Sequence, residues 1–405
     1  MLENFLRLIT LRLQSGGKTM DACIVGWGHT KFGRLDESTL EDMIVEVSKE
    51  AVAHAGIEFS DIDGIWLGNY NAGLVPDGFA SSLALNADDA LRFTPATRVE
   101  NACASGAAAL FSARAAIQAG QAKIALVIGA EKMTSQTTEG VTEALGSASY
   151  QKEEAGTSFP QIFARFAQAY FQEYGDHSAA LAKIAAKNHA NALNNPLAHL
   201  RKDVGFEACN TVSDRNPIIA APLRMTDCSL ISDGASAIIL MAEDVAENMK
   251  HKVGFRAATH MNDYLPMSRR DVLAFEGPAN AIQSTLKAAG AGLDDIAFAE
   301  VHDCFTIAEL LIYEAMGLAP KGQGARAIAD GTVYADGKLP VNVSGGLKAK
   351  GHPVGATGVS MHVLAAQQLT GSAGEMQLKN PELGMVFNMG GSGVANFCTI
   401  LENRS

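Results

Sequence analysis

The sequence has no pair of closely spaced cysteines. Its six cysteines are scattered over 405 residues and never form a Cys-x-x-Cys pair. Zinc ribbons are built on such pairs, and disulfide scaffolds need a far higher density of cysteine. Both classes are therefore excluded, and we expect the thiols to be reduced.

Positive charge and long apolar runs are also scarce. Lys and Arg number 32 against 44 Asp and Glu, which gives a net charge of −12. A nonspecific nucleic-acid binder needs a cationic face to displace phosphate counterions, so nucleic acid is not an expected partner. No stretch reaches the roughly 18 uncharged residues of a membrane span. The composition therefore predicts a globular protein of about two to four folding units without a membrane span.

Residues 1–19 form a segment ahead of the first predicted strand. With Arg7 and Arg12 on one side it has the amphipathic character of an organelle-targeting sequence, whereas Glu3 and its single serine count against that interpretation. We interpret it as an N-terminal extension ahead of Met20. The expected location is then the cytoplasm, or an organelle if the extension acts as a targeting segment.

A strand-helix-strand unit opens the predicted globular part. Residues 21–27 have the pattern of a strand, and Ser38 with Glu41 has the spacing of a capping box. Apolar residues then recur at helical spacing, which predicts a helix over about 39–55. A second strand-like run follows at 65–68.

The same order of elements recurs in the second half of the chain. The first helix ends at Gly56 and is followed by Asp61 and a strand, and a later helix ends at Gly290 and is followed by Asp295 and a strand. Self-similarity of this kind indicates a duplicated βα unit.

Each half also closes on a similar strand, at 233–241 and at 392–401. In the second half, a tight glycine turn joins this strand to the preceding one at 385–388. In the first half, the insertion 131–230 separates it from the preceding strand at 124–129. The insertion is rich in helix formers, so we expect it to form a lid or loop domain over a site.

Two further segments, 104–119 and 356–369, are predicted to be helices that are apolar on nearly every side. Helices without a polar face belong in a core. An architecture that sandwiches one such helix from each half between two sheets would bury both. It would also bring their N-terminal ends close together.

A cysteine and a histidine stand at the beginnings of these two helices. Cys103 precedes the first, where the partial positive charge of a helix start favours a nucleophilic thiolate. A single free cysteine is more often an inert core residue, so both interpretations stay open for it. His352 precedes the second, within the glycine-rich segment 342–360, whose turns allow the backbone to approach a ligand. On its own, His352 is equally compatible with a structural role.

Two more segments carry candidate polar groups. His302 and Cys304 follow a predicted strand, where the sites of α/β proteins usually lie, and are candidate acids or bases. Asn388 and Gly390 belong to a glycine turn that either presents backbone N–H donors to an oxyanion or is a plain hairpin turn. Cysteine and histidine are also zinc ligands, but glycine turns suit oxyanion donation better than metal coordination, so we expect no metal.

In this order and at these separations, four blocks resemble the active-site blocks of the thiolase superfamily. They are NACASG, HDCF, SGGLKAKGHPVGATG and NMGGSG, and the resemblance covers 21–402. Ordinary biosynthetic thiolases carry NEAF instead of HDCF, and Cys-x-Gly where this chain has Asn388-Met389-Gly390. The pattern is similar to the sterol-carrier-protein-type thiolases and their bacterial acetyl-CoA acetyltransferase-like relatives, in which the acid/base cysteine comes from HDCF.

The resemblance implies an α/β architecture, the thiolase fold. Two duplicated βαβαβαββ halves would stack in five layers, α-β-α-β-α, with a helical loop domain inserted in the first half. The implied boundaries are 20–130 with 231–250 for the N-terminal half, 131–230 for the loop domain and 251–405 for the C-terminal half. A homodimer or tetramer is expected.

The resemblance further implies CoA-dependent cleavage of 3-ketoacyl-CoA, or the reverse Claisen condensation, in lipid metabolism such as fatty acid β-oxidation. Cys103 would be acylated with help from His352. His302 and His352 would hold the enolate, and Cys304 would deliver the proton to carbon. Acyl-CoA and CoA are the expected partners; CoA is a substrate, and no permanently bound cofactor is expected.

Other site residues follow from the same blocks. Backbone N–H groups of Cys103 and Gly390 would form a second oxyanion hole in the turn that contains Asn388, and Ser344 with Gly345 would bind substrate. Two alternatives stay open: a related condensing enzyme or retro-aldolase acting on acyl-CoA, and a noncatalytic acyl-CoA or lipid-binding homologue. The presence of both Cys103 and Cys304 favours the thiolase.

Overall fold

The computed structural model describes residues 21–405, so the predicted extension 1–19 and Met20 lie outside the described residues. The first half of the chain builds a five-stranded sheet in the order β3-β2-β4-β7-β1. Its strands are β1 (Ala22–His29), β2 (Gly64–Gly68), β3 (Ala96–Val99), β4 (Ile124–Glu131) and β7 (Gly234–Ala242).

The second half repeats this sheet in the order β8-β11-β10-β9. Its strands are β8 (Val253–Asn262), β9 (Phe298–Val301), β10 (Leu383–Gly390) and β11 (Ala395–Asn403). The pairing directions also match: β1 with β7 and β8 with β11 are antiparallel, while β2 with β4 and β9 with β10 are parallel. The predicted duplication is confirmed.

The two halves differ in detail from the predicted βαβαβαββ order. In the place of β3, the second half has only a parallel bridge between Ala299 and Val341. In the first half, the element between β2 and β3 is the 3-10 segment η2 (Ala80–Ala87), whereas the second half has a regular helix, α10 (Thr306–Met316), at that place.

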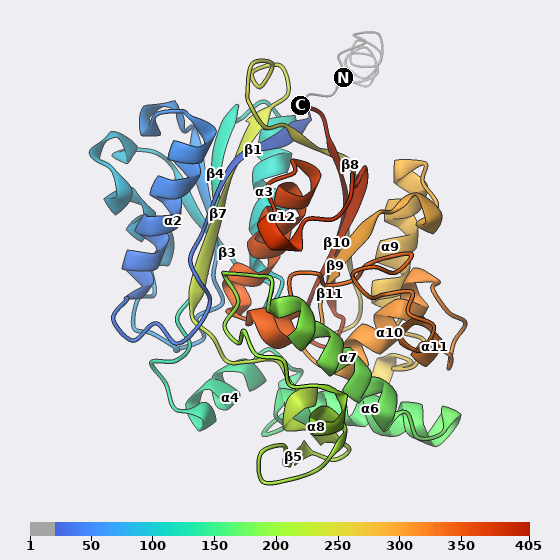
Figure 1. The fold of residues 1–405 in the computed structure, drawn as a ribbon. Coiled ribbons are helices and arrows are strands. Elements are labelled where there is room, and N and C mark those ends of the chain that lie inside the picture. The colour runs from blue at the N-terminus through green and yellow to red at the C-terminus, as the bar shows by residue number, and fades with distance from the viewer. Residues whose placement is uncertain (1–20) are drawn as a thin grey trace, which may run out of the picture.

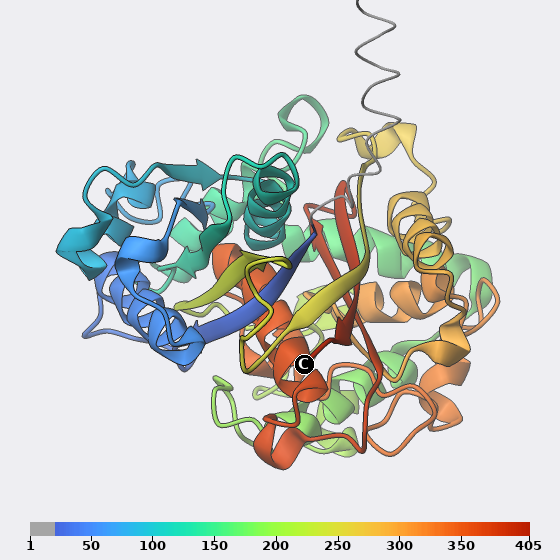
Figure 2. The same ribbon diagram turned by 90° about the horizontal axis from the view of Figure 1, so that it is seen from above.

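The layers follow the predicted α-β-α-β-α stack. Helix α2 (Leu40–Ala55) covers the outer face of the first sheet, and α9 (Glu276–Ala289) with α10 covers the outer face of the second (Figure 1). The sheets join at one corner, where Cys23 pairs with Gly254 and Ile24 with Val253, so all nine strands are continuous. Away from this corner the sheets diverge around the two central helices (Figure 2).

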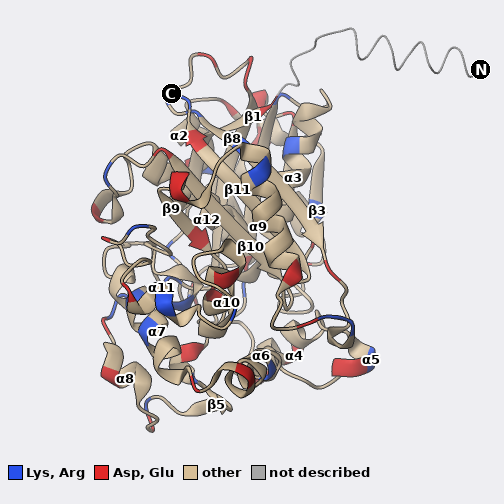
Figure 3. Cartoon of the chain, turned by 90° about the vertical axis from the view of Figure 1, so that its right-hand side faces the viewer, with Lys and Arg blue, Asp and Glu red and all other residues tan. Residues whose placement is uncertain are grey.

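The central helices are α3 (Ser105–Gln118) and α12 (Val354–Leu369). Helix α12 has no charged residue, is almost wholly buried and is drawn entirely in tan in Figure 3. The helices touch backbone to backbone, because a Cβ added to Gly358 would lie 2.2 Å from the nitrogen of Ala107. The two helices lie side by side as predicted, with α12 buried almost throughout, whereas α3 is exposed at Ala115 and Gln118.

The start of α2 corrects one expectation. The capping box is formed by Thr39 and Asp42 rather than by Ser38 and Glu41. The Thr39 hydroxyl accepts from the Asp42 N–H at 3.1 Å, and the Asp42 carboxylate accepts from the Thr39 N–H at 2.9 Å. The pattern is thus shifted by one residue, and the shorter Asp replaces the usual Glu at the third helical position.

The insertion leaves β4 and returns to β7. It contains four helices of at least five residues, namely α4 (Thr138–Gly146), α6 (Phe159–Tyr174), α7 (Ser178–Ala192) and α8 (Phe206–Asn210), with the hairpin β5 (Ile218–Ala220) and β6 (Leu223–Arg224). These helices gather at the end of the stack where α12 begins (Figure 1). Asp233 joins the two ends of the insertion, because its carboxylate accepts from Lys132, Met133 and Thr134.

Among the described residues, no helix combines the length and apolar character needed to cross a membrane.

Candidate active site

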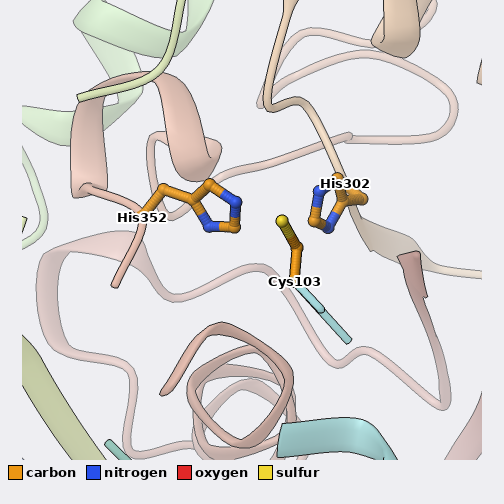
Figure 4. A group of neighbouring side chains, drawn as sticks. All are labelled: Cys103, His302 and His352. Carbon is orange, nitrogen blue, oxygen red and sulfur yellow. The ribbon is translucent and has the colours of Figure 1, made fainter. Parts of the chain in front are cut away.

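Three side chains from distant parts of the sequence meet where the central helices begin. Cys103 precedes α3, His302 follows β9, and His352 precedes α12. The Cys103 sulfur and one ring nitrogen of each histidine lie within 4.8 Å of one another. The imidazole rings stand edge to face with their centroids 5.1 Å apart (Figure 4). The predicted convergence of Cys103 and His352 is therefore present in the structure.

A tight turn presents Cys103. Ala102 adopts a left-handed conformation with φ of 50°, which is unusual for a residue with a side chain. The Ser105 hydroxyl stabilises the turn by donating to the carbonyl of Ala102 at 2.7 Å and accepting from the N–H of Asn101 at 2.9 Å. The sulfur is thereby held at the beginning of the buried helix α3.

The Cys103 thiol is protonated at rest. Burial raises its pKa to about 12, and hydrogen bonds to the sulfur from the N–H of Gly391 and from its own N–H offset this only in part. This corrects the expectation that the start of α3 favours the thiolate. Desolvation destabilises the thiolate by more than the partial positive charge at the start of α3 stabilises it. The nucleophile therefore needs a base in contact with it.

His352 has the hydrogen bonds of such a base. The Thr357 hydroxyl donates to the carbonyl of Pro353 at 3.0 Å, so it accepts from Nδ1 of His352 at 2.7 Å. This fixes the proton on Nδ1 and leaves a lone pair on Nε2. Nε2 is buried, has no partner within 21–405, and points toward the sulfur (Figure 4). Burial, followed by the charge of Lys350, lowers the pKa of His352 to about 3, so the imidazole is neutral.

His302 has the opposite tautomer. The side-chain amide of Asn388 must direct its nitrogen toward the carbonyl of Cys103, 3.3 Å away, because that oxygen only accepts. The same nitrogen therefore donates to Nδ1 of His302 at 2.9 Å. The proton of His302 then sits on Nε2, which has no partner in the described chain. Burial lowers the pKa of His302 well below its usual value, so this ring is also neutral.

An apolar cavity of about 490 Å³ opens from these groups. Cys103, Cys304, His352 and Gly391 line its reactive end. Its other walls are mostly aliphatic and aromatic, and include Met133, Val141, Leu145, Phe159, Ile219, Met225, Ile231, Phe305 and Val354. Burial raises the pKa of Cys304 well above its usual value. Cys304 is thus a protonated thiol facing the same space.

A larger hollow of about 1060 Å³ lies between the end of α9 and the end of β11, around Arg256 and Glu402. It has no lining residue in common with the apolar cavity, and its walls are mainly polar.

Five residues named from the sequence do not line the apolar cavity, namely His302, Ser344, Gly345, Asn388 and Gly390. Ser344 is buried and donates to Glu300 at 2.6 Å. Gly345 packs on the insertion, since an added Cβ would lie 2.6 Å from the Cβ of Ala192. Gly390 packs on the turn before Cys103, while its neighbour Gly391 lines the cavity.

Two functional groups escaped the sequence analysis. Thr357 lies five residues after His352, on the first turn of α12. A hydroxyl residue at this spacing from the histidine was the feature of the sequence that could have indicated a hydrogen bond between them. Gly391 stands next to Gly390 in the glycine turn, and sequence alone does not say which N–H faces the sulfur.

Comparisons with known proteins agree with this geometry. The profile described as Thiolase, N-terminal domain matches residues 22–244, and that described as Thiolase C-terminal domain-like matches 258–403. The chain belongs to the thiolase family, and its fold is the thiolase fold.

Individual relatives refine the picture. Acetyl-CoA acetyltransferase of Methanothermobacter thermautotrophicus is 41% identical over 92% of this chain and 97% of its own. Human sterol carrier protein 2 is 32% identical over 91% of this chain and 69% of its own. Among solved structures, the Ltp2-ChsH2(DUF35) aldolase superposes with a TM-score of 0.79 at 23% identity, covering 95% of this chain and 98% of its own. The resemblance to sterol-carrier-protein-type relatives is thus confirmed.

Proposed function

We propose that this protein is a thiolase that cleaves 3-ketoacyl-CoA with free CoA, or runs the reverse Claisen condensation, through an acyl-cysteine intermediate. The observation that carries the proposal is the pair of complementary imidazoles around the Cys103 sulfur. His352 presents a lone pair and His302 presents an N–H. The 41% identical relative named acetyl-CoA acetyltransferase supports the same reaction class.

In the first half-reaction, Cys103 is the nucleophile. Nε2 of His352 takes the thiol proton as the sulfur attacks carbon 3 of the substrate. The bond between carbons 2 and 3 then breaks, and the acyl group stays on the sulfur. The electron pair of the broken bond goes to the departing acetyl-CoA fragment as an enolate.

The enolate needs a donor at its oxygen and a proton at its carbon. The Nε2–H of His302 and the imidazolium formed at His352 supply the donors. Cys304 supplies the proton, because burial keeps its thiol protonated and it lines the same cavity as Cys103. Two neutral thiols and two neutral imidazoles thus complete the step without a net change of charge at the site.

In the second half-reaction, the thiol of free CoA attacks the acyl-Cys103 thioester. The imidazolium of His352 first returns its proton to the Cys304 thiolate. Nε2 of His352 then takes the CoA thiol proton, the acyl group leaves on CoA, and the same proton passes to the Cys103 thiolate. The N–H groups that face the Cys103 sulfur, from Gly391 and from Cys103 itself, are placed to hold the oxyanion of this step. We propose Gly391 for this role rather than Gly390.

The finer properties are part of the same proposal. We propose that 131–230 acts as the loop domain, since α4 and the β5–β6 hairpin contribute walls of the cavity. We propose a cytoplasmic enzyme of lipid metabolism, such as fatty acid β-oxidation, with acyl-CoA and CoA as partners and no permanently bound cofactor.

We also propose a homodimer or tetramer. Among the described residues, strand β3 ends the sheet, and Phe79 and Phe93, which precede it in the sequence, are 76% and 85% exposed. An unpaired strand edge flanked by exposed aromatic rings supports association with a second copy. Sedimentation of the purified protein gives its oligomeric state, and a monomer at micromolar concentration would contradict this part.

The test compares the wild type with Cys103→Ala and Cys304→Ala. The wild type should cleave acetoacetyl-CoA in the presence of CoA, and Cys103→Ala should abolish the reaction. Cys304→Ala should still form the Cys103 adduct but should lose proton exchange at the α-carbon of acetyl-CoA. An unchanged rate in Cys103→Ala would refute the proposal.

Further arms of this assay separate the alternatives. Aldehyde release without CoA consumption would indicate a retro-aldolase, and binding of acyl-CoA without any adduct would indicate a noncatalytic homologue. Cys103, His302 and His352 offer ligand types that zinc accepts. Full activity after dialysis against a chelator is expected, and loss of activity that zinc restores would indicate a metal site.

A further inference from the structure

A buried charged cluster lies beside the active site without lining its cavity. It consists of Lys187 and Asn188 on α7, Asp303 between the two site residues His302 and Cys304, and Glu309 on α10. We call these four residues the α7 clamp. None of them is more than 2% exposed. The proposed reaction leaves all four without a role.

Asp303 connects the two loops that supply the reactive groups. Its carboxylate accepts from the N–H of Leu347 at 2.6 Å and from the N–H of Lys348 at 3.1 Å. These amides belong to the π-helical turn Gly346–Lys350 in the loop that leads into His352. The loop wraps closely around the carboxylate, since a Cβ on Gly346 would lie 2.3 Å from Oδ2 of Asp303. The position of His302 and Cys304 is thus coupled to that of His352 through one side chain.

Helix α7 holds this carboxylate from the other side. The amide nitrogen of Asn188 donates one hydrogen to Asp303 at 2.7 Å and the other to Glu309 at 2.6 Å. Lys187 is paired with Glu309 at 2.8 Å and also donates to the carbonyl of Val341 at 2.6 Å. The insertion therefore provides the amide that bridges the two carboxylates and the lysine that balances their charge.

The clamp is costly to bury. Burial, followed by the charge of Glu309, raises the pKa of Asp303 above its usual value, while the amides of Leu347 and Lys348 favour the ionised form. Buried charges are weak contributors to stability, because apolar residues of similar volume often serve as well or better. Unlike an apolar core, the clamp makes short, directional hydrogen bonds to the backbone of the loop before His352.

We infer that Asp303 is a positioning residue, and that the Asp303–Asn188 contact lets helix α7 of the insertion hold His302 and Cys304 in register with His352. This inference rests on the proposed thiolase function. It predicts that the clamp affects the reaction steps that need both the loop with His302 and Cys304 and the loop that leads into His352. Proton exchange at the α-carbon uses His302, Cys304 and His352. Acylation of Cys103 by acetyl-CoA forms no enolate and needs only Cys103 and His352, which directly precede the central helices.

The experiment measures these two steps separately in Asp303→Asn and Asn188→Leu. Misplacing a reacting group by about 1 Å costs on the order of 100-fold, so exchange of the α-protons of acetyl-CoA should fall by about that factor. Acylation of Cys103 by acetyl-CoA should fall by about tenfold or less. Equal losses in the two steps would overturn the inference.

The control is Asn216→Leu. Asn216 is a buried asparagine of the same insertion whose amide donates only to carbonyls within it, from Ala208, Cys209 and Thr211. This variant should lose stability without separating the two rates. Because Asp303 and Asn188 act through one contact, the double variant should be no worse than its worse single parent. Losses that multiply would contradict a shared contact.

A second readout needs no substrate. Hydrogen exchange of the Leu347 and Lys348 amides should be faster in Asp303→Asn and Asn188→Leu than in the wild type and Asn216→Leu. Unchanged exchange would overturn the inference whether or not the protein is active. If the wild type fails to acylate Cys103, the proposed function fails, and amide exchange still decides whether the clamp holds the loop.

Discussion

The hydrogen bond between Thr357 and His352 predicts the effect of one isosteric substitution. Thr357→Val keeps the shape of the side chain and removes only the hydroxyl that accepts from Nδ1 of His352 at 2.7 Å. The Nδ1–H is then left buried without an acceptor. Moving the proton to Nε2 does not restore activity, because Nε2 must be free to take the proton of Cys103.

The size of the effect on the acylation rate follows from these two states of His352, one with an unpaired Nδ1–H and one with the inactive tautomer. An unsatisfied buried donor costs roughly 1–3 kcal/mol, and the active tautomer of the variant is disfavoured by the same amount. Since about 1.4 kcal/mol corresponds to a factor of ten in rate, acylation of Cys103 should slow by roughly 5- to 150-fold. The free energy of unfolding should fall by the same roughly 1–3 kcal/mol.

The assay mixes enzyme with acetoacetyl-CoA in the absence of CoA and follows acyl-Cys103 by intact mass after acid quenching. The matched control is Thr399→Val. Thr399 contacts Nε2 of His362 at 3.0 Å, so it belongs to a second buried threonine–histidine pair outside the site. The control should lose similar stability and keep the wild-type acylation rate. Wild-type acylation in Thr357→Val, or equal slowing in both variants, would refute the assignment of His352 as a base held by Thr357.

Three further predictions follow from the buried environment of the site. Alkylation of Cys103 by iodoacetamide should rise about tenfold per pH unit from pH 7 to 9, because the pKa of its thiol is about 12; a plateau near pH 7 would instead reveal a resting thiolate. Gly358→Ala should lower stability by roughly 1–3 kcal/mol or more, because the new Cβ would lie 2.2 Å from the nitrogen of Ala107. Gly78→Ala, with no atom within 4 Å of its new Cβ, is the control; equal melting temperatures in the two variants would contradict the close packing of α3 and α12. Burial lowers the pKa of His362 to about 4 in the folded protein, compared with about 6.5 in the unfolded chain. The unfolded chain therefore binds a proton at His362 before the folded protein does. The resulting loss of folding stability is absent above about pH 6.5 and grows as the pH falls toward 4. At pH 5.5 that loss is about 1.4 kcal/mol, and His362→Gln should show a correspondingly shallower fall of unfolding free energy with acidity than the wild type; parallel pH dependences would contradict a neutral buried His362.

The fold was predictable because the sequence repeats its own boundary signals. Gly56 and Gly290 both end their helices in a left-handed conformation, and Asp61 and Asp295 both cap the short 3-10 turn that follows. The apolar character of α12 likewise predicted its burial between sheets. The one-residue shift of the capping box at Thr39 was not predictable, because adjacent Ser and Thr residues both satisfy the pattern.

The site was predictable in outline and less so in its electrostatics. The block pattern pointed to Cys103, His302, Cys304 and His352, and the structure brings these side chains around one cavity or one sulfur. The protonation of Cys103 did not follow from its place before α3, since desolvation depends on everything that encloses the sulfur. The hydrogen bond from the Ser344 hydroxyl to Glu300 was likewise not predictable, because the two residues are 44 positions apart in the sequence.

Acyl transfer to one sulfur is the central claim, and a single measurement addresses it most directly. The protein is incubated with acetoacetyl-CoA, quenched in acid, digested and sequenced by mass spectrometry, in parallel with Cys103→Ala. We predict an acetyl group on Cys103 that disappears when CoA is added and is absent from the variant. A stable adduct on another residue, or CoA-dependent cleavage that continues in Cys103→Ala, would contradict the account.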